Sequence, residues 1–77
     1  MHIVIKGTRT IAEYKQTQQE MTAQATDCYA AHQSAVESWT EGEPVKVWKE
    51  DGDVICIEYE SGHWWHYRQT GAGLEWW

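Results

Sequence analysis

The sequence has no phenylalanine, only two cysteines and only six basic residues among its 77. Two cysteines are too few for a disulfide scaffold, so both are expected to be small buried residues in a reducing compartment. Six basic against twelve acidic residues give a net charge of −6. This balance argues against direct nucleic-acid binding and favours a basic protein partner, including one that itself binds nucleic acid.

Long hydrophobic segments are missing as well. No apolar run reaches the roughly 18 residues of a membrane-spanning helix, and residues 1–6 are too few for a signal peptide. From these two absences we predict a cytoplasmic protein that has no membrane partner.

Catalytic motifs are equally scarce. The sequence contains no glycine-rich phosphate loop, no nucleophile elbow and no paired-carboxylate motif. Cys28 and His32 lie one helical turn apart, but such a pair on a buried stripe more often packs than reacts. Cys56 and His66 are expected on opposite faces of a sheet, and the cysteines and histidines lack zinc-ligand spacing. The sequence therefore predicts no enzyme activity, no catalytic residue, no metal and no other cofactor.

Aromatic residues are what the sequence has in excess, with six tryptophans and four tyrosines. A single domain spanning residues 1–77 has a marginal core. Large aromatics reinforce such a core because each buries about 150–250 Å². Some tryptophans must therefore be structural, and the question is whether one small core shelters all six.

The longest periodic segment is residues 11–39, where a mostly apolar stripe recurs at steps of three and four. Thr10 and Glu13 have the spacing of a capping box, in which each side chain accepts a hydrogen bond from the other residue's amide. Pro44 lies beyond the expected end. A helix of this length spans about 44 Å, more than a strand of about 20 Å. Either it breaks, near Asp27, or it overhangs its sheet and its exposed stripe needs a partner.

The flanking segments have the period of strands. Residues 2–6 form a short β-branched run, and the chain after Pro44 alternates with period two. Asp51-Gly52 and Ser61-Gly62 predict tight two-residue turns. The predicted strands are residues 2–6, 45–49, 54–60, 63–69 and a short 74–77. The fold class is α+β: one long N-terminal helix, continuous or broken, on an antiparallel meander of three to four strands with a short N-terminal strand.

Two-residue turns assign each residue to a sheet face. One face then carries Lys46, Trp48, Ile55, Ile57, Tyr59, Trp64, His66 and Arg68, and the other carries Val45, Val47, Lys49, Val54, Cys56, Glu58, Trp65 and Tyr67. Both faces hold aromatics, but one helix covers only one face. We expect the second set to lie under the helix and the first to face outward. The outward aromatics are covered by the terminal Trp76-Trp77 segment, by a partner or by a ligand, or they only hold neighbouring strands together.

Acidic residues gather around the first hairpin, at Glu50, Asp51 and Asp53, followed by Glu58 and Glu60. Charged turns commonly serve solubility. The alternative is an acidic knob that occupies the basic, nucleic-acid-binding groove of another protein, as a phage or mobile-element inhibitor of the anti-CRISPR kind would.

The sequence thus predicts a non-enzymatic protein-interaction module that forms a homodimer. Its anchors would be Trp48, Tyr59 and Trp64, because interface energy concentrates on large aromatics and arginine. The predicted partner-binding residues are Trp48, Tyr59, Trp64, His66, Arg68, Glu50, Asp51 and Asp53. Two alternatives stay open: inhibition by charge mimicry through the hairpin, and a small carbohydrate-binding module that uses exposed tryptophans.

Overall fold

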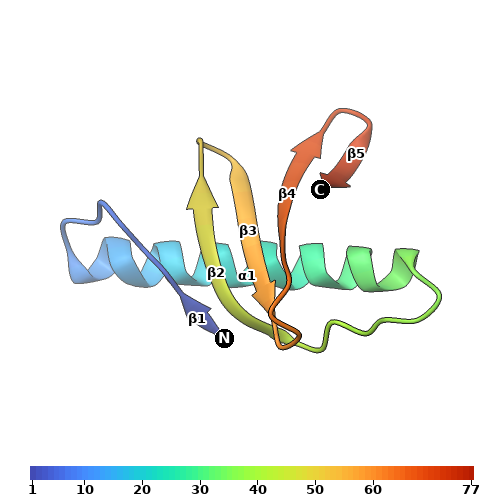
Figure 1. The fold of residues 1–77 in the computed structure, drawn as a ribbon. Helices are drawn as coiled ribbons and strands as arrows, with labels where there is room; N and C mark the ends of the chain where they lie inside the picture. The colour runs from blue at the N-terminus through green and yellow to red at the C-terminus, as the bar shows by residue number, and fades with distance from the viewer.

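A computed structural model describes residues 1–77 and shows one helix crossing one face of a five-stranded sheet (Figure 1). The elements are β1 (His2–Ile3), α1 (Ile11–Ala35), β2 (Pro44–Glu50), β3 (Val54–Tyr59), β4 (Trp64–Thr70) and β5 (Gly73–Trp76). The predicted α+β fold class is confirmed, including the short fourth strand of the meander.

The sheet has the order β1-β2-β3-β4-β5. Strands β2 to β5 form an antiparallel meander, and β1 pairs with β2 in parallel. β1 is shorter than predicted because its ladder ends where the Val4 amide donates to the Val47 carbonyl, at 2.8 Å. Beyond this point the edge of β2 is left without a neighbouring strand.

The helix begins where the sequence predicts. Thr10 is the N-cap, and its hydroxyl accepts a hydrogen bond from the Glu13 amide at 3.1 Å. The Glu13 carboxylate accepts from the Arg9 amide at 2.9 Å rather than from Thr10, so the predicted reciprocal bond is shifted by one residue. α1 continues through Asp27 without a break. Its first turns extend past the sheet, which leaves Ile11 76 % exposed and Tyr14 43 % exposed.

The helix ends four residues earlier than the predicted Trp39. Val36 is extended, with φ −115° and ψ 147°. The chain then folds back, and the Trp39 indole donates to the Gly42 carbonyl at 2.6 Å and packs against Tyr59. Trp39 has the helical spacing of the apolar stripe in the sequence, but it lies in a loop after α1, from which its indole packs against the core.

Both hairpin loops contain three residues instead of two, which corrects the predicted register. Glu50 pairs with Val54, leaving residues 51–53 in the first loop. The Tyr59 amide donates to the His63 carbonyl at 2.9 Å, leaving residues 60–62 in the second. Each extra residue shifts the pairing by one. β3 is therefore inverted relative to the prediction, while the two shifts cancel in β4.

The inversion of β3 decides which residues form the core. Ile55, Ile57 and Tyr59, predicted to face outward, are buried beneath α1, whereas Cys56 faces away from it. The main core lies between α1 and this inner face of the sheet, and its buried residues are Ile3, Met21, Ala25, Cys28, Val47, Ile55, Ile57, Tyr59 and Tyr67. Cys28 and Cys56 are free thiols on opposite sides of the sheet.

Candidate functional site

Aromatic side chains gather on both faces of the sheet. The inner cluster, on the α1 side, comprises His32, Trp39, Trp65, Tyr67 and Trp76. The outer cluster, on the open face, comprises Trp48, Trp64, His66 and Trp77. Neighbouring residues of a strand point to opposite faces. Each Trp-Trp pair, 64–65 and 76–77, therefore contributes one indole to each cluster.

The centre of the inner cluster is buried. His32 is 3 % exposed and its ring centroid lies 4.7 Å from that of Trp65 and 4.5 Å from that of Trp76. Its Nδ1 lies 2.7 Å from the Tyr67 hydroxyl, which lies 2.7 Å from the Tyr59 hydroxyl. Burial lowers the pKa of His32 and raises the pKa of Tyr59 to about 12, so both stay neutral near pH 7. His32 and Tyr67 therefore belong to the core, and the partly buried indoles of Trp39, Trp65 and Trp76 pack around them.

The outer cluster is open. Its ring centroids follow one another at 5.4 Å from Trp48 to Trp64, 4.8 Å from Trp64 to His66 and 4.9 Å from His66 to Trp77. Trp64 is 47 % exposed and Trp77 50 % exposed. Figure 1 shows α1 on the other side of the sheet only. These rings therefore form a continuous aromatic strip that no element of the chain covers.

A cationic side chain lies over the aromatic ring at each end of the outer cluster. The Lys46 ammonium lies 5.4 Å from the Trp48 ring centroid, and the Arg68 guanidinium lies 5.5 Å from that of Trp77. Arg68 is held in turn by a hydrogen bond from its Nε to the Glu75 carboxylate at 2.9 Å. Cation–π contacts at exposed sites contribute about 0.5–1 kcal/mol each, so both contacts favour the ring positions seen at the ends of the strip.

Glu50 belongs to the outer face more than to the hairpin tip. One carboxylate oxygen accepts a hydrogen bond from the Trp48 indole at 3.3 Å, and the other lies 3.4 Å from His66 Nε2. The Cys56 thiol lies between them on β3, and burial, together with the nearby Glu50 carboxylate, raises its pKa to about 11. The expectation that Cys56 and His66 lie on opposite faces is wrong, because they are cross-strand partners.

The predicted acidic cluster is divided between two ends of the sheet. Asp51 and Asp53 are exposed in the first loop. Glu58 and Glu60 lie at the other end of β3, where the Glu60 carboxylate accepts from the Glu43 amide at 2.7 Å. The acidic surface at the hairpin therefore consists of Glu50, Asp51 and Asp53 alone.

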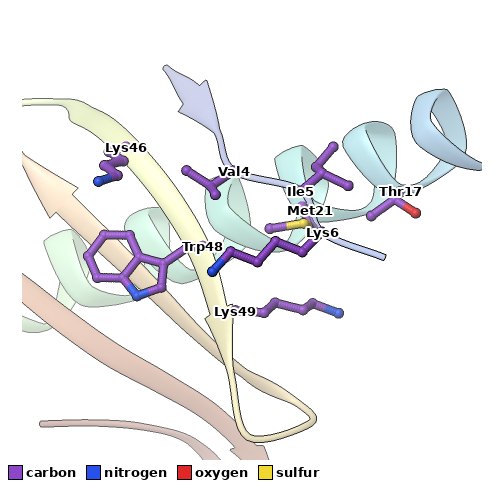
Figure 2. A pocket seen from close by; sticks show the side chains of 8 residues that line it. All are labelled: Val4, Ile5, Lys6, Thr17, Met21, Lys46, Trp48 and Lys49. Carbon is purple, nitrogen blue, oxygen red and sulfur yellow. The ribbon is translucent and has the colours of Figure 1, made fainter. Parts of the chain in front are cut away.

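Positive charge gathers at the open edge of β2. A cavity of about 310 Å³ there is lined by Val4, Ile5, Lys6, Thr17, Met21, Lys46, Trp48 and Lys49 (Figure 2). Its three lysines are half of the basic residues of the chain. Because Trp48 lines it, this cavity borders the outer cluster and presents cations beside the aromatic strip.

Of the predicted partner-binding aromatics, Trp48 and Trp64 share the outer face as expected. Tyr59 does not: it is fully buried under α1, because the three-residue first loop inverts β3. Trp77 was not among the predicted partner-binding residues, although its segment was one of the expected covers of this face. Its backbone exchanges two hydrogen bonds with His66, at 3.0 and 3.2 Å. Strict alternation along residues 74–77 was the available signal, since Trp76 and Trp77 cannot share a face.

Comparison with protein families, curated proteins and solved structures gives no match for this chain. No helix combines the length and apolar character that crossing a bilayer requires. Function must therefore be argued from the surfaces described above.

Proposed function

We propose that this protein is a non-enzymatic binding module that recognises another protein through its outer cluster. The observation that carries the proposal is the aromatic strip itself. Trp48, Trp64 and Trp77 pack against one another or against His66 on the face that α1 leaves open, and two of them are about half exposed. Exposed apolar patches with charged rims are typical of interaction sites, and tryptophan is the residue most enriched at their hot spots.

The rim favours a protein over a sugar. Charges of both signs surround the strip, with Lys46 and Arg68 against Glu50 and Glu75, and such a mixed rim orients a protein partner. The rings do not form a flat platform, because Trp48 and Trp64 are tilted by 46° and Trp64 and His66 by 50°. A net charge of −6 favours a partner whose own surface is basic.

Charge mimicry by the hairpin has weaker support. Only three acidic residues lie there, and one of them, Glu50, is engaged by Trp48 and His66. In this proposal Asp51 and Asp53 steer the partner, and the indoles hold it. An inhibitor that blocks a basic groove remains a special case of the same binding module.

The predicted homodimer would use a different surface. The overhanging end of α1 exposes Ile11 and Tyr14, which continue the stripe that packs on the sheet. We expect a concentration-dependent dimer that Ile11→Glu dissociates, measured by sedimentation. A dimer lost on Trp64→Ala instead would make the outer cluster itself the homodimer contact.

The proposal is tested by selecting peptides from a randomised display library against the wild-type protein. Selected binders should be rich in basic residues and should lose about 30-fold in affinity with Trp64→Ala or Trp77→Ala, the loss expected of a hot spot. Val36→Ala is the control, since it removes an exposed apolar side chain at the end of α1, outside both proposed surfaces. Binders unaffected by the outer variants, or tryptophan quenching by oligosaccharides alone, would overturn the proposal.

A further inference from the structure

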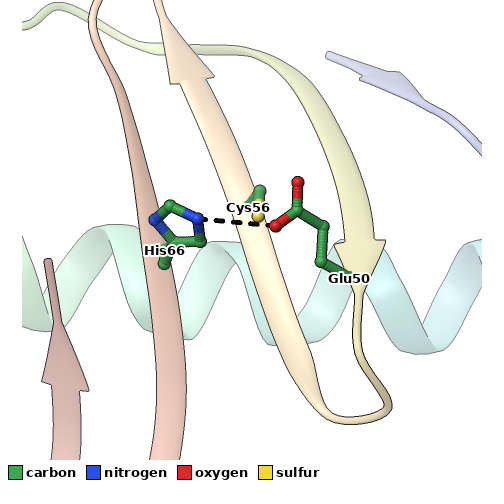
Figure 3. Close-up of side chains that lie close together, drawn as sticks. All are labelled: Glu50, Cys56 and His66. Atoms are coloured by element: carbon green, nitrogen blue, oxygen red, sulfur yellow. Dashed lines mark ion pairs between the residues drawn. The ribbon is translucent and has the colours of Figure 1, made fainter.

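The middle of the outer face brings three metal-binding side chains together (Figure 3). Cys56, on β3, is the cross-strand partner of His66 on β4. Glu50, the last residue of β2, reaches back over Cys56 toward His66. One carboxylate oxygen, the thiol sulfur and one imidazole nitrogen all lie within 4.8 Å of one another.

The His66 ring is held against Trp77. Its plane is within 2° of that of Trp77, and its Nδ1 lies 3.3 Å from the Trp77 carbonyl oxygen. Donation from Nδ1 to this carbonyl leaves Nε2 as the lone-pair nitrogen, directed at Glu50. Metal-ligating histidines characteristically use one ring nitrogen in this way to fix the other.

The Glu50 carboxylate is held in a similar manner. Its Oε1 accepts a hydrogen bond from the Trp48 indole at 3.3 Å, while Oε2 faces His66 Nε2 at 3.4 Å. Both flanking side chains therefore have one polar atom tied to a neighbour and the other directed toward the same space. Cys56 lies at the base of that space and is fully buried.

We propose that Glu50, Cys56 and His66 bind a zinc ion with a fourth coordination position open to solvent. Sulfur, imidazole nitrogen and carboxylate oxygen are the three donors that zinc takes from proteins, in a tetrahedral arrangement. Thiolate and imidazole disfavour magnesium and calcium, which prefer oxygen alone. Because zinc–ligand bonds are about 2.0–2.3 Å long, the three donor atoms would have to move closer to one another than they are now. The Glu50 side chain is 43 % exposed at the end of β2 and only its Oε1 is hydrogen-bonded, so a rotamer change brings Oε2 closer to the other two donors.

The ion pair between His66 and Glu50 is the simpler explanation of the same geometry. It accounts for two of the three residues but gives Cys56 no role. The zinc inference is independent of the proposed protein partner, since it concerns ions that bind the isolated chain. The two therefore succeed or fail separately.

The test uses the full chain, stripped of metal by chelation, and titrates it with Co²⁺ as a spectroscopic substitute for Zn²⁺. The expected result is an equimolar complex with a thiolate-to-cobalt charge-transfer band and the strong visible bands of tetrahedral cobalt, both abolished by added Zn²⁺. Dialysis against Zn²⁺ should leave equimolar zinc, measured by mass spectrometry of the element.

Variants identify the ligands. Cys56→Ser should remove the charge-transfer band, and His66→Gln and Glu50→Gln should weaken cobalt binding by about tenfold or more. Cys28→Ser and His63→Gln are the matched controls, because each removes the same residue type elsewhere. Circular dichroism checks folding. If Cys56→Ser does not fold, the other two variants decide, since neither side chain is fully buried. Absence of the band in the wild type, or its loss with Cys28→Ser only, would overturn the inference.

Discussion

The aromatic clusters on the two faces of the sheet have similar compositions. Each carries three tryptophans and one histidine, and each histidine stacks on one of the last two residues: His32 on Trp76 at 4.5 Å, His66 on Trp77 at 4.9 Å. The two clusters differ in whether a helix packs over them. α1 contributes His32 to the centre of the inner cluster, where its ring bonds a tyrosine hydroxyl, whereas no helix packs on the open face, where His66 lies beside a carboxylate. Residue type alone therefore does not decide whether an indole is structural or available.

The largest expected effect separates two adjacent tryptophans. Trp65→Ala removes a partly buried inner indole and should lower the free energy of unfolding by about 3 kcal/mol, while Trp64→Ala should cost less than about 1 kcal/mol. Urea unfolding followed by circular dichroism measures both. Equal losses would show that the outer cluster holds the sheet together as much as the inner one does.

The Tyr67 hydroxyl connects His32 with Tyr59 in the buried core. Tyr67→Phe leaves His32 and Tyr59 without the hydroxyl that both contact at 2.7 Å. We expect a loss of about 1–3 kcal/mol in unfolding free energy, because buried polar groups are left unsatisfied. Tyr14→Phe, at an exposed position of α1, should have no measurable effect. A neutral Tyr67→Phe would mean that the hydrogen-bond chain contributes nothing.

The buried histidine of the inner cluster should make stability depend on pH. Burial lowers the pKa of His32, although the Glu41 carboxylate opposes this, so the unfolded chain binds the proton more tightly. The stability that neutral His32 contributes is complete above about pH 6.5 and is lost as the pH falls toward the folded pKa. Unfolding free energy should decrease from about pH 7 to about pH 5, less steeply in His32→Gln. Gln33→Ala, an exposed neighbour of His32 on α1 that removes no ionisable group, should keep the wild-type slope.

The smallest expected effect concerns the rim of the outer cluster. Arg68 and Glu75 are each about half exposed, at 48 % and 45 %, so Arg68→Met should change stability by less than about 1 kcal/mol. Its effect on the selected peptides should be larger, because Arg68 orients the Trp77 ring. Thermal unfolding and peptide affinity, measured on the same variant, make the comparison. A large loss of stability with unchanged peptide affinity would mean that Arg68 stabilises the fold and does not contribute to binding.

Much of the fold follows from local patterns. The cap at Thr10 starts α1, and the alternation after Pro44 gives the meander. The outer face was predicted correctly on β2 and β4, where Trp48 and His66 lie. β3 was inverted because Asp51-Gly52 suggests a two-residue turn, while the chain uses three. One extra residue exchanged Tyr59 for Cys56 on the open face, since side chains alternate with period two.

The sequence by itself determined where the helix starts, that a meander follows, and that adjacent tryptophans point apart, because these depend on interactions over a few residues. Only the tertiary structure decided which sheet face α1 covers, and therefore which three tryptophans lie on the open face. It also placed Cys56 beside Glu50 and His66. The reason is that loop length and helix docking depend on packing between elements distant in the chain, which local patterns do not encode.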